Sequence, residues 1–466
     1  MPSNVLSARF IAFLSELNRR RSLLFFDFFI DCMKHFLSIF LLFPMLVAFS
    51  ACGEDRTPEY EQLTACDHWM TTAMKDYYLW GDSIKEDELA WKTFFYQPQT
   101  FFSNLIKFAP ITDSWSWCEV DTLNEDHHER GYFNHIDSYG MDFLLMTDPT
   151  GATSRQYARV KTVIKDSPAD RAGLERGDFI GMVDGNRMTS AYLSYLISGR
   201  KRTLVVSKLG VNDDQTEFYW TQEDTVYMDR SEYVEDLPFP VVSSFQLDNV
   251  NVAYLMCNRL TTGPIETEPE SQSYVDEMKS TMKAIKELNS KVMVLDLRLC
   301  NFGDLSMAAL LGSYVAGERA ANRIFAQTFH RSDKADDDQT FYFDNMATTD
   351  ALEPELLFVI TSSYTSGAAE WLIRALRNVL GEANVYVVGQ TTNGQIVITE
   401  EIHSEYYVTI NPAVAFVADE YGDYSYASGI RPDVEINEMS YVQLYPYGDE
   451  NEVILSAILG EVDSMY

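Results

Sequence analysis

The stretch that decides the fold is ELLFVITSSYTSGAAEWLIRALRNVLGEANVYVVGQ, residues 355–390. It opens on an apolar run, continues through a polar turn into a helical pattern, and ends on a second apolar run. Two buried strands joined by a helix form a β-α-β unit, in which the strands lie parallel. The stretch therefore predicts a mostly parallel sheet covered by helices.

The same alternation extends upstream to about Val250. The strand patterns VNVAYLMC (250–257) and KVMVLDLR (291–298) alternate with the helical patterns SYVDEMKSTMKAIKELN (273–289) and AALLGSYVA (308–316). Apolar residues at helical spacing mark the helices, and short continuous apolar runs mark the buried strands. We expect an α/β core over residues 213–466, in a chain that is multidomain α/β and α+β overall.

Two helical stretches come before this core. The segment 59–80 places Leu63, Trp69, Met70, Met74 and Tyr77 at helical spacing, and TFFSNLIKFAP (100–110) is a second helical pattern. At 466 residues the chain is also longer than one hydrophobic core usually organises. We therefore expect a small helical domain over residues 56–129 ahead of the other domains.

The sequence pattern in the middle of the chain predicts mainly β-strands. In RVKTVIKDSPADRAGLERGDFIGMVDGNRM (159–188), strands alternate with a short helix and with turns marked by Gly, Pro and Asp. This stretch resembles a PDZ domain, which we place at residues 130–212. The resemblance implies a carboxylate-binding loop at Tyr139, Gly140, Met141, Asp142 and Phe143, where backbone N–H groups converge on the end of a peptide. A plain hairpin turn at Gly140 is the alternative.

The N-terminus has the pattern of a secretory signal. FLSIFLLFPMLVAF (36–49) is apolar but short for a membrane span, follows the basic segment MKH, and precedes small residues and Cys52. The pattern resembles a bacterial lipoprotein box, which implies a signal over residues 1–52 and lipid on Cys52. Asp27 and Asp31 stand where positive charge is wanted, so we expect Met33 to be the true start.

Composition excludes several classes of function. The chain has 70 acidic against 36 basic residues, a net charge of -34, and such a surface repels a phosphate backbone. Nucleic acid is therefore not an expected partner. The six cysteines form no CxxC pattern, and we expect no metal and no cofactor. A disulfide is possible in an oxidising compartment, but the sequence assigns no pairs.

The order of these motifs resembles the C-terminal processing, or tail-specific, serine peptidase family. The residues that carry the resemblance are the PDZ pattern and the segments DSWSW (113–117), VMVLDLR (292–298), TSGAAE (365–370), VVGQTTNGQ (387–395) and GIRPDV (429–434). The resemblance implies a crotonase-like α/β core in which a serine and a lysine cut polypeptides that the PDZ domain helps to select.

The residues that should carry this chemistry are replaced. In the family the nucleophilic serine stands three residues before the glutamate that matches Glu370, and that position is Gly367 here. The family's lysine base falls on Gln395, and its later glutamine falls on Thr399. The oxyanion segment reads DLRLCNFGD (296–304), without the family's glycine pair. A serine needs an adjacent base to attack, and neither glycine nor glutamine supplies the missing group.

Ser366 is the remaining candidate nucleophile, one position early. It could pair with His403, the only histidine after the 389–395 turn, but we favour a surface position for His403. We favour a role for Ser366 as the N-cap of the helix that follows, because serine is among the residues preferred there.

We predict a lipid-anchored homologue of the tail-specific peptidases in the cell envelope, periplasmic or surface-facing, of a Gram-negative bacterium. It binds the C-termini of extracytoplasmic polypeptides, and cleavage is lost or reduced. One alternative is an active serine endopeptidase that uses Ser366. The other is a structural or glycan-binding surface lipoprotein.

Overall fold

The computed structural model describes residues 57–89, 91–120, 137–214, 217–264, 270–345, 347 and 351–466. The predicted signal, the Met33 start and the lipid site Cys52 lie outside these residues. Packing divides the chain into two compact units, Met1–Ala65 and Cys66–Tyr466, and the sheets and the candidate site described below belong to the second. No helix in the described part of the chain has the length and apolar character needed to cross a bilayer.

The centre of the second unit is a six-stranded sheet with the order β19-β14-β13-β10-β9-β8. All neighbours pair in parallel except β8, which runs antiparallel to β9. This confirms the α/β core that the sequence predicts. The strands are β8 (Val242–Gln246), β9 (Asn251–Met256), β10 (Val292–Asp296), β13 (Leu356–Thr361), β14 (Val385–Gly389) and β19 (Val434–Glu435).

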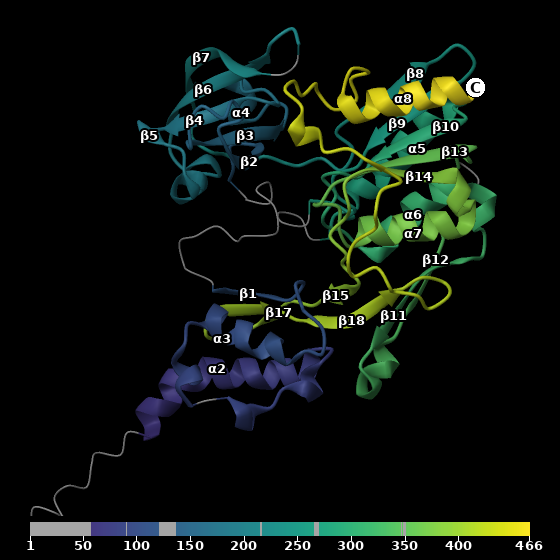
Figure 1. Ribbon diagram of the computed structural model, residues 1–466. Coiled ribbons are helices and arrows are strands. Elements are labelled where there is room, and N and C mark those ends of the chain that lie inside the picture. Colours follow the sequence, from purple (N-terminus) through teal and green to yellow (C-terminus); the bar gives the residue numbers. More distant parts are fainter. Residues whose placement is uncertain are drawn as a thin grey trace, which may run out of the picture. The chain divides into compact units, whose positions relative to one another are not determined.

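Helices cover both faces of this sheet, as Figure 1 shows. Along β9, Val252 and Tyr254 belong to one apolar cluster and Ala253 and Leu255 to another, because successive side chains of a strand point to opposite faces. The first cluster includes residues of α8, and the second includes residues of α5, α6 and α7. These helices are α5 (Ser273–Glu287), α6 (Leu305–Ala316), α7 (Ala368–Leu380) and α8 (Val453–Met465).

Two smaller antiparallel sheets flank the core, with the orders β12-β11-β18-β15 and β1-β17-β16. Strand β1 comes from the predicted N-terminal helical segment and pairs with β17, with Trp117 opposite Asn411. Phe101 of that segment belongs to the same apolar cluster as Leu295 of the central sheet. The segment 56–129 therefore contributes a strand and apolar residues to the core. The elements are α2 (Thr57–Tyr77), α3 (Pro98–Leu105), β1 (Trp117–Val120), β11 (Ile324–His330), β12 (Thr340–Tyr342), β15 (Val397–Thr399), β16 (Ile402–His403), β17 (Val408–Asn411) and β18 (Ala413–Ala418).

The middle segment forms an antiparallel sheet with the order β2-β3-β4-β6-β7 and an apolar cluster of its own. Its last strand ends at Met228, because β6 and β7 form one long hairpin that continues past the predicted boundary at residue 212. Strand β2 lies at an edge of this sheet. The elements are β2 (Met141–Thr147), β3 (Gln156–Val163), α4 (Pro168–Arg171), β4 (Phe179–Val183), β5 (Asn186–Arg187), β6 (Arg202–Val211) and β7 (Phe218–Met228).

Short 3₁₀ helices connect many of these elements. They are η1 (Gly81–Ser83), η2 (Glu86–Glu88), η3 (Trp91–Phe95), η4 (Ile106–Phe108), η5 (Ser190–Leu196), η6 (Gly317–Ala320), η7 (Ser332–Asp337), η9 (Glu382–Asn384) and η10 (Glu438–Ser440). Of these, η10 contributes Glu438 and Met439 to the lining of the cavity described below.

Candidate functional site: the cleft at the start of α7

The candidate site begins where β13 turns into α7. Helix α7 starts at Ala368, and its N-cap is Gly367, with a φ of 57° that favours glycine. The N-cap interpretation of Ser366 is therefore wrong. The positive φ at Gly367 places the helix start one residue later, and the Gly367 N–H donates to the Glu370 carboxylate at 3.1 Å.

Gly367 and Gln395 lie close together beside the start of α7. A Cβ placed on Gly367 lies 3.4 Å from both Cδ and Oε1 of Gln395. Glu370 fixes this arrangement, because its buried carboxylate also accepts the backbone N–H groups of Gly394 at 2.6 Å and Gln395 at 2.7 Å. The two positions predicted to match the family's nucleophile and base thus lie close together, and they hold a bare backbone and a carboxamide.

The Ser366 hydroxyl points elsewhere. Its Oγ donates to the backbone carbonyl of Asn301 at 3.1 Å, and its N–H donates to the carbonyl of Cys300 at 3.1 Å. The side chain is 2% exposed. His403 lies on β16, where its Nδ1 is 2.9 Å from the Thr409 hydroxyl. Ser366 and His403 therefore each contact a different partner, and the role of Ser366 as a nucleophile stays a prediction.

The segment after β10 forms the opposite wall of the cleft. The carbonyl of Leu297 accepts the Thr365 hydroxyl at 2.8 Å, and the carbonyl of Arg298 accepts the Ser362 hydroxyl at 2.5 Å. Gly303 has a φ of 156° and packs so closely on Leu260 that a Cβ would lie 2.5 Å from the Leu260 Cβ. This remaining glycine of the predicted oxyanion segment is therefore required by packing.

These walls enclose a cavity of about 410 Å³. Hydroxyl and carboxamide side chains make up much of its lining, which is Leu144, Lys161, Arg298, Leu299, Asn301, Ser362, Ser363, Tyr364, Ser366, Gln390, Asn393, Asn437, Glu438 and Met439. Among the described residues, no group of three or more His, Cys, Asp or Glu side chains is placed to hold a metal ion. The lining can hydrogen-bond a polar ligand.

Lys161, on strand β3, is the functional candidate that the sequence did not reveal. Its Nζ lies 2.7 Å from Asp142 Oδ2 and 3.4 Å from the centre of the Tyr364 ring. Burial lowers the pKa of Lys161, but Asp142 and Tyr364 outweigh it, and the net pKa is above the ordinary lysine value. A lysine that stays protonated cannot serve as a general base at neutral pH.

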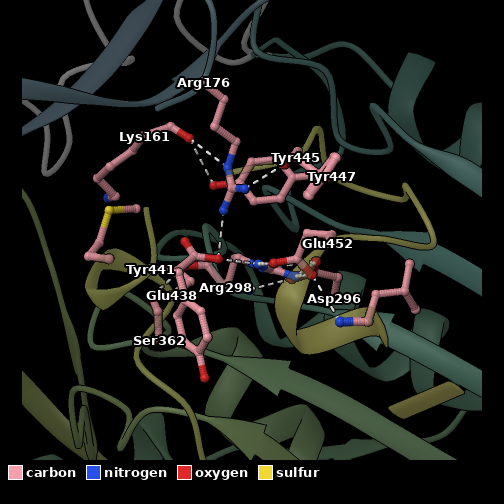
Figure 2. A network of polar contacts seen from close by, with 12 residues as sticks. Lys161, Arg176, Asp296, Arg298, Ser362, Glu438, Tyr441, Tyr445, Tyr447 and Glu452 are labelled. Atoms are coloured by element: carbon pink, nitrogen blue, oxygen red, sulfur yellow. Dashed lines mark hydrogen bonds and ion pairs between the residues drawn. The ribbon is translucent and has the colours of Figure 1, made fainter. Parts of the chain in front are cut away.

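A network of buried charges borders the cavity (Figure 2). Arg298 is 1% exposed and contacts Asp296 at 2.7 Å, Glu452 at 3.0 Å, and Glu438. Arg176, from the turn between α4 and β4, contacts the same Glu438 carboxylate at 2.7 Å. Burial raises the pKa of Glu438, but the two arginines lower it more, so the net pKa is below its usual range. The network ties the segment around η10 to both the central and the middle sheet.

Some backbone N–H groups of the predicted carboxylate-binding loop already donate hydrogen bonds to other groups of the protein. Gly140 has a φ of 74°, as the predicted turn requires, and its N–H donates to the Ser138 hydroxyl at 3.0 Å. The N–H of Tyr139 donates to the carbonyl of Ile197 at 3.0 Å, and that of Phe143 donates to Asp142 Oδ1 at 2.8 Å. All five predicted loop residues, Tyr139, Gly140, Met141, Asp142 and Phe143, are buried. Their binding of a peptide stays a prediction.

Comparison with known proteins agrees with this architecture. Residues 159–208 match the family model described as PDZ domain, and residues 252–436 match that of peptidase family S41. The carboxy-terminal processing protease CtpA of Bacillus subtilis (strain 168) is 24% identical over 305 residues, which span 64% of this chain and 57% of that protein. A crystal structure from Bacteroides fragilis NCTC 9343, of a protein assigned to the S41 proteases, is 26% identical, with a TM-score of 0.73 over 85% of this chain and 97% of that one. The chain therefore carries a PDZ domain and a segment that matches peptidase family S41.

Proposed function

We propose that this protein binds the C-terminal segments of polypeptides in the cleft and does not cut them by the serine–lysine chemistry of its family. The observation that carries the proposal is the closeness of Gly367 to Gln395, where a Cβ added to the glycine would lie 3.4 Å from the carboxamide. Acyl transfer needs a nucleophile activated by an adjacent base, and neither a glycine nor a glutamine supplies one. Lys161 is no substitute, because its pKa is raised.

Peptide binding is supported by the edge strand β2. An extended peptide can add to the open edge of a sheet through backbone hydrogen bonds, which is a common mode of recognition by PDZ domains. Leu144 of this strand also lines the cavity, so a peptide paired with β2 would lead into the cleft. The choice of C-terminal segments rests on the family and on the relative that is named a carboxy-terminal processing protease.

We place this binding outside the cytoplasm. The support is the signal pattern that ends at Cys52, which predicts a lipid-anchored mature chain and extracytoplasmic polypeptides as partners. Growth with radiolabelled palmitate should label the wild-type protein and leave a Cys52→Ala variant unlabelled. Equal labelling of the two would contradict the anchor.

The proposal is tested with residues 53–466 and an unstructured protein that ends in apolar residues and a free carboxylate. We expect binding by calorimetry, and the same protein recovered intact after prolonged incubation. Ser366→Ala is assayed beside the wild type, with Ser280→Ala, on α5 and outside the cavity lining, as the control. Cleavage by the wild type and by the Ser280 variant, but not by Ser366→Ala, would establish the active peptidase instead.

A further inference from the structure

The wall of the cavity differs in charge from the rest of the molecule. Its lining contains two cationic residues, Lys161 and Arg298, and one anionic residue, Glu438, although the whole chain has a net charge of -34. Arg298 already contacts three carboxylates, those of Asp296, Glu438 and Glu452. Lys161 is therefore the cation on this wall that is better placed to meet an anionic ligand group.

The surroundings of Lys161 hold its ammonium in place. The side chain is 7% exposed, one N–H points to Asp142 Oδ2 at 2.7 Å, and the Tyr364 ring lies over the ammonium at 3.4 Å. An ammonium has three N–H groups, so the contact with Asp142 leaves donor capacity for a ligand. A fixed cation gains more from a charge-assisted hydrogen bond than a mobile one, because it loses less side-chain freedom.

Neutral donors accompany this cation. The carboxamides of Gln390 and Asn393 and the hydroxyl of Ser363 line the same cavity. Within the described part of the chain, these three side chains make no hydrogen bond to another residue of the protein. A carboxylate has two oxygens that each accept more than one hydrogen bond, and it suits a cation surrounded by such donors.

The Gly140 turn is less available to a carboxylate. The N–H of Gly140 donates to the Ser138 hydroxyl, and the N–H of Tyr139 donates to the backbone carbonyl of Ile197. A ligand would have to displace both acceptors. We propose that Lys161 recognises the terminal carboxylate of the polypeptide bound in the cleft. This inference rests on the proposed function and names the residue that recognises the C-terminal carboxylate of the ligand.

The test compares two mixtures of fluorescein-labelled decapeptides randomised at their last four positions, one with free C-terminal carboxylates and one with C-terminal amides. Binding is measured by fluorescence anisotropy with residues 53–466. The variants are Lys161→Met, Lys161→Arg, and Asp142→Asn/Lys161→Met, which leaves no unpaired carboxylate in the interior. Lys208→Met is the matched control, since Lys208 also forms ion pairs in the middle sheet but does not line the cavity.

We expect the wild type to bind the acids about tenfold or more tightly than the amides, as for a charge-assisted hydrogen bond. Lys161→Met and the double variant should bind both mixtures with the affinity of the amides, whereas Lys161→Arg and Lys208→Met should keep the preference. Folding is checked by circular dichroism.

Three outcomes overturn the inference. If the folded Lys161→Met variants keep the preference for acids, another group reads the chain end, and the proposed function stands. If the wild type binds both mixtures equally, peptides bind but no carboxylate is recognised. If it binds neither mixture, the proposed function fails and this inference fails with it.

Discussion

Replacing Gly367 by serine and Gln395 by lysine together should give the cleft a nucleophile and a base in contact. A Cβ at position 367 lies 3.4 Å from the Gln395 carboxamide, so a serine hydroxyl there lies within reach of a lysine at 395. Glu370 accepts backbone N–H groups from both positions, at 3.1 Å and 2.7 Å, and so holds them in register. We expect Gly367→Ser/Gln395→Lys to react with serine-directed probes.

The double substitution should cost little folding stability and should raise the rate of labelling strongly. A non-glycine residue held at a φ of 57° costs about 1–3 kcal/mol, against a typical total stability of about 5–15 kcal/mol. Among the described residues, and apart from its two chain neighbours, the nearest atoms to the new Cβ lie at 3.4 Å, which is ordinary van der Waals contact. A positioned general base contributes about 10²–10⁴-fold to a rate, and a nucleophile and its base act as a unit. The double variant should therefore react about 10²-fold faster than either single variant, or more.

The assay is the rate of labelling by a biotinylated fluorophosphonate, with the labelled residue located by mass spectrometry. Gly367→Ala/Gln395→Lys is the matched control, because it has the same backbone strain and the same lysine but no hydroxyl. Circular dichroism and urea denaturation establish that each variant is folded. A folded double variant that is labelled no faster than its single variants would refute the claim that these two positions are a vacant dyad.

Two further predictions concern stability. Glu438→Gln should lower the free energy of unfolding at neutral pH by about 3–5 kcal/mol, because it removes a buried carboxylate that contacts Arg176 and Arg298. The two arginines hold the pKa of Glu438 below its usual range. The carboxylate therefore stabilises the fold above the ordinary glutamate pKa, and this stabilisation is lost as the pH falls through the lower folded pKa. The free energies of unfolding of wild type and variant, measured by urea titration, should converge in acid, and a difference that does not change with pH would contradict this. Asp67→Asn should stabilise the protein by about 1–3 kcal/mol at pH 8 and little at pH 4. Burial raises the pKa of Asp67 to about 7, so the wild type loses stability as the pH rises toward 7. An unchanged free energy of unfolding at pH 8 would disprove this prediction.

The central sheet could be predicted from the sequence because its signals are local. The run VMVL (292–295) is apolar throughout, as is typical of a strand buried on both faces, and it forms most of β10. The pattern around Gly367 likewise predicts the start of α7, because a helix that follows a strand needs a turn there. Matching Gly367 and Gln395 to the family also named two positions that the structure brings close together.

What the sequence did not reveal depends on contacts between distant segments. Lys161 lies on β3, far along the chain from Tyr364, and only the fold brings its ammonium over that ring. The pairing of β1 with β17 is of the same kind, since four residues after a helical segment carry no signal of a partner. The N-cap was misassigned for a different reason. Serine is preferred there on average, but the backbone conformation at Gly367 decides this helix.

The contact of Arg176 with Glu438 limits how this protein can be recombined with others. A PDZ domain transplanted from another protein would need an arginine at the position of Arg176. Without it, Glu438 would keep only Arg298 of its two arginine partners in this network. It would also remove Lys161 and Leu144 from the wall of the cleft. Exchanging the PDZ domain therefore also changes a wall of the cleft and the partners of Glu438.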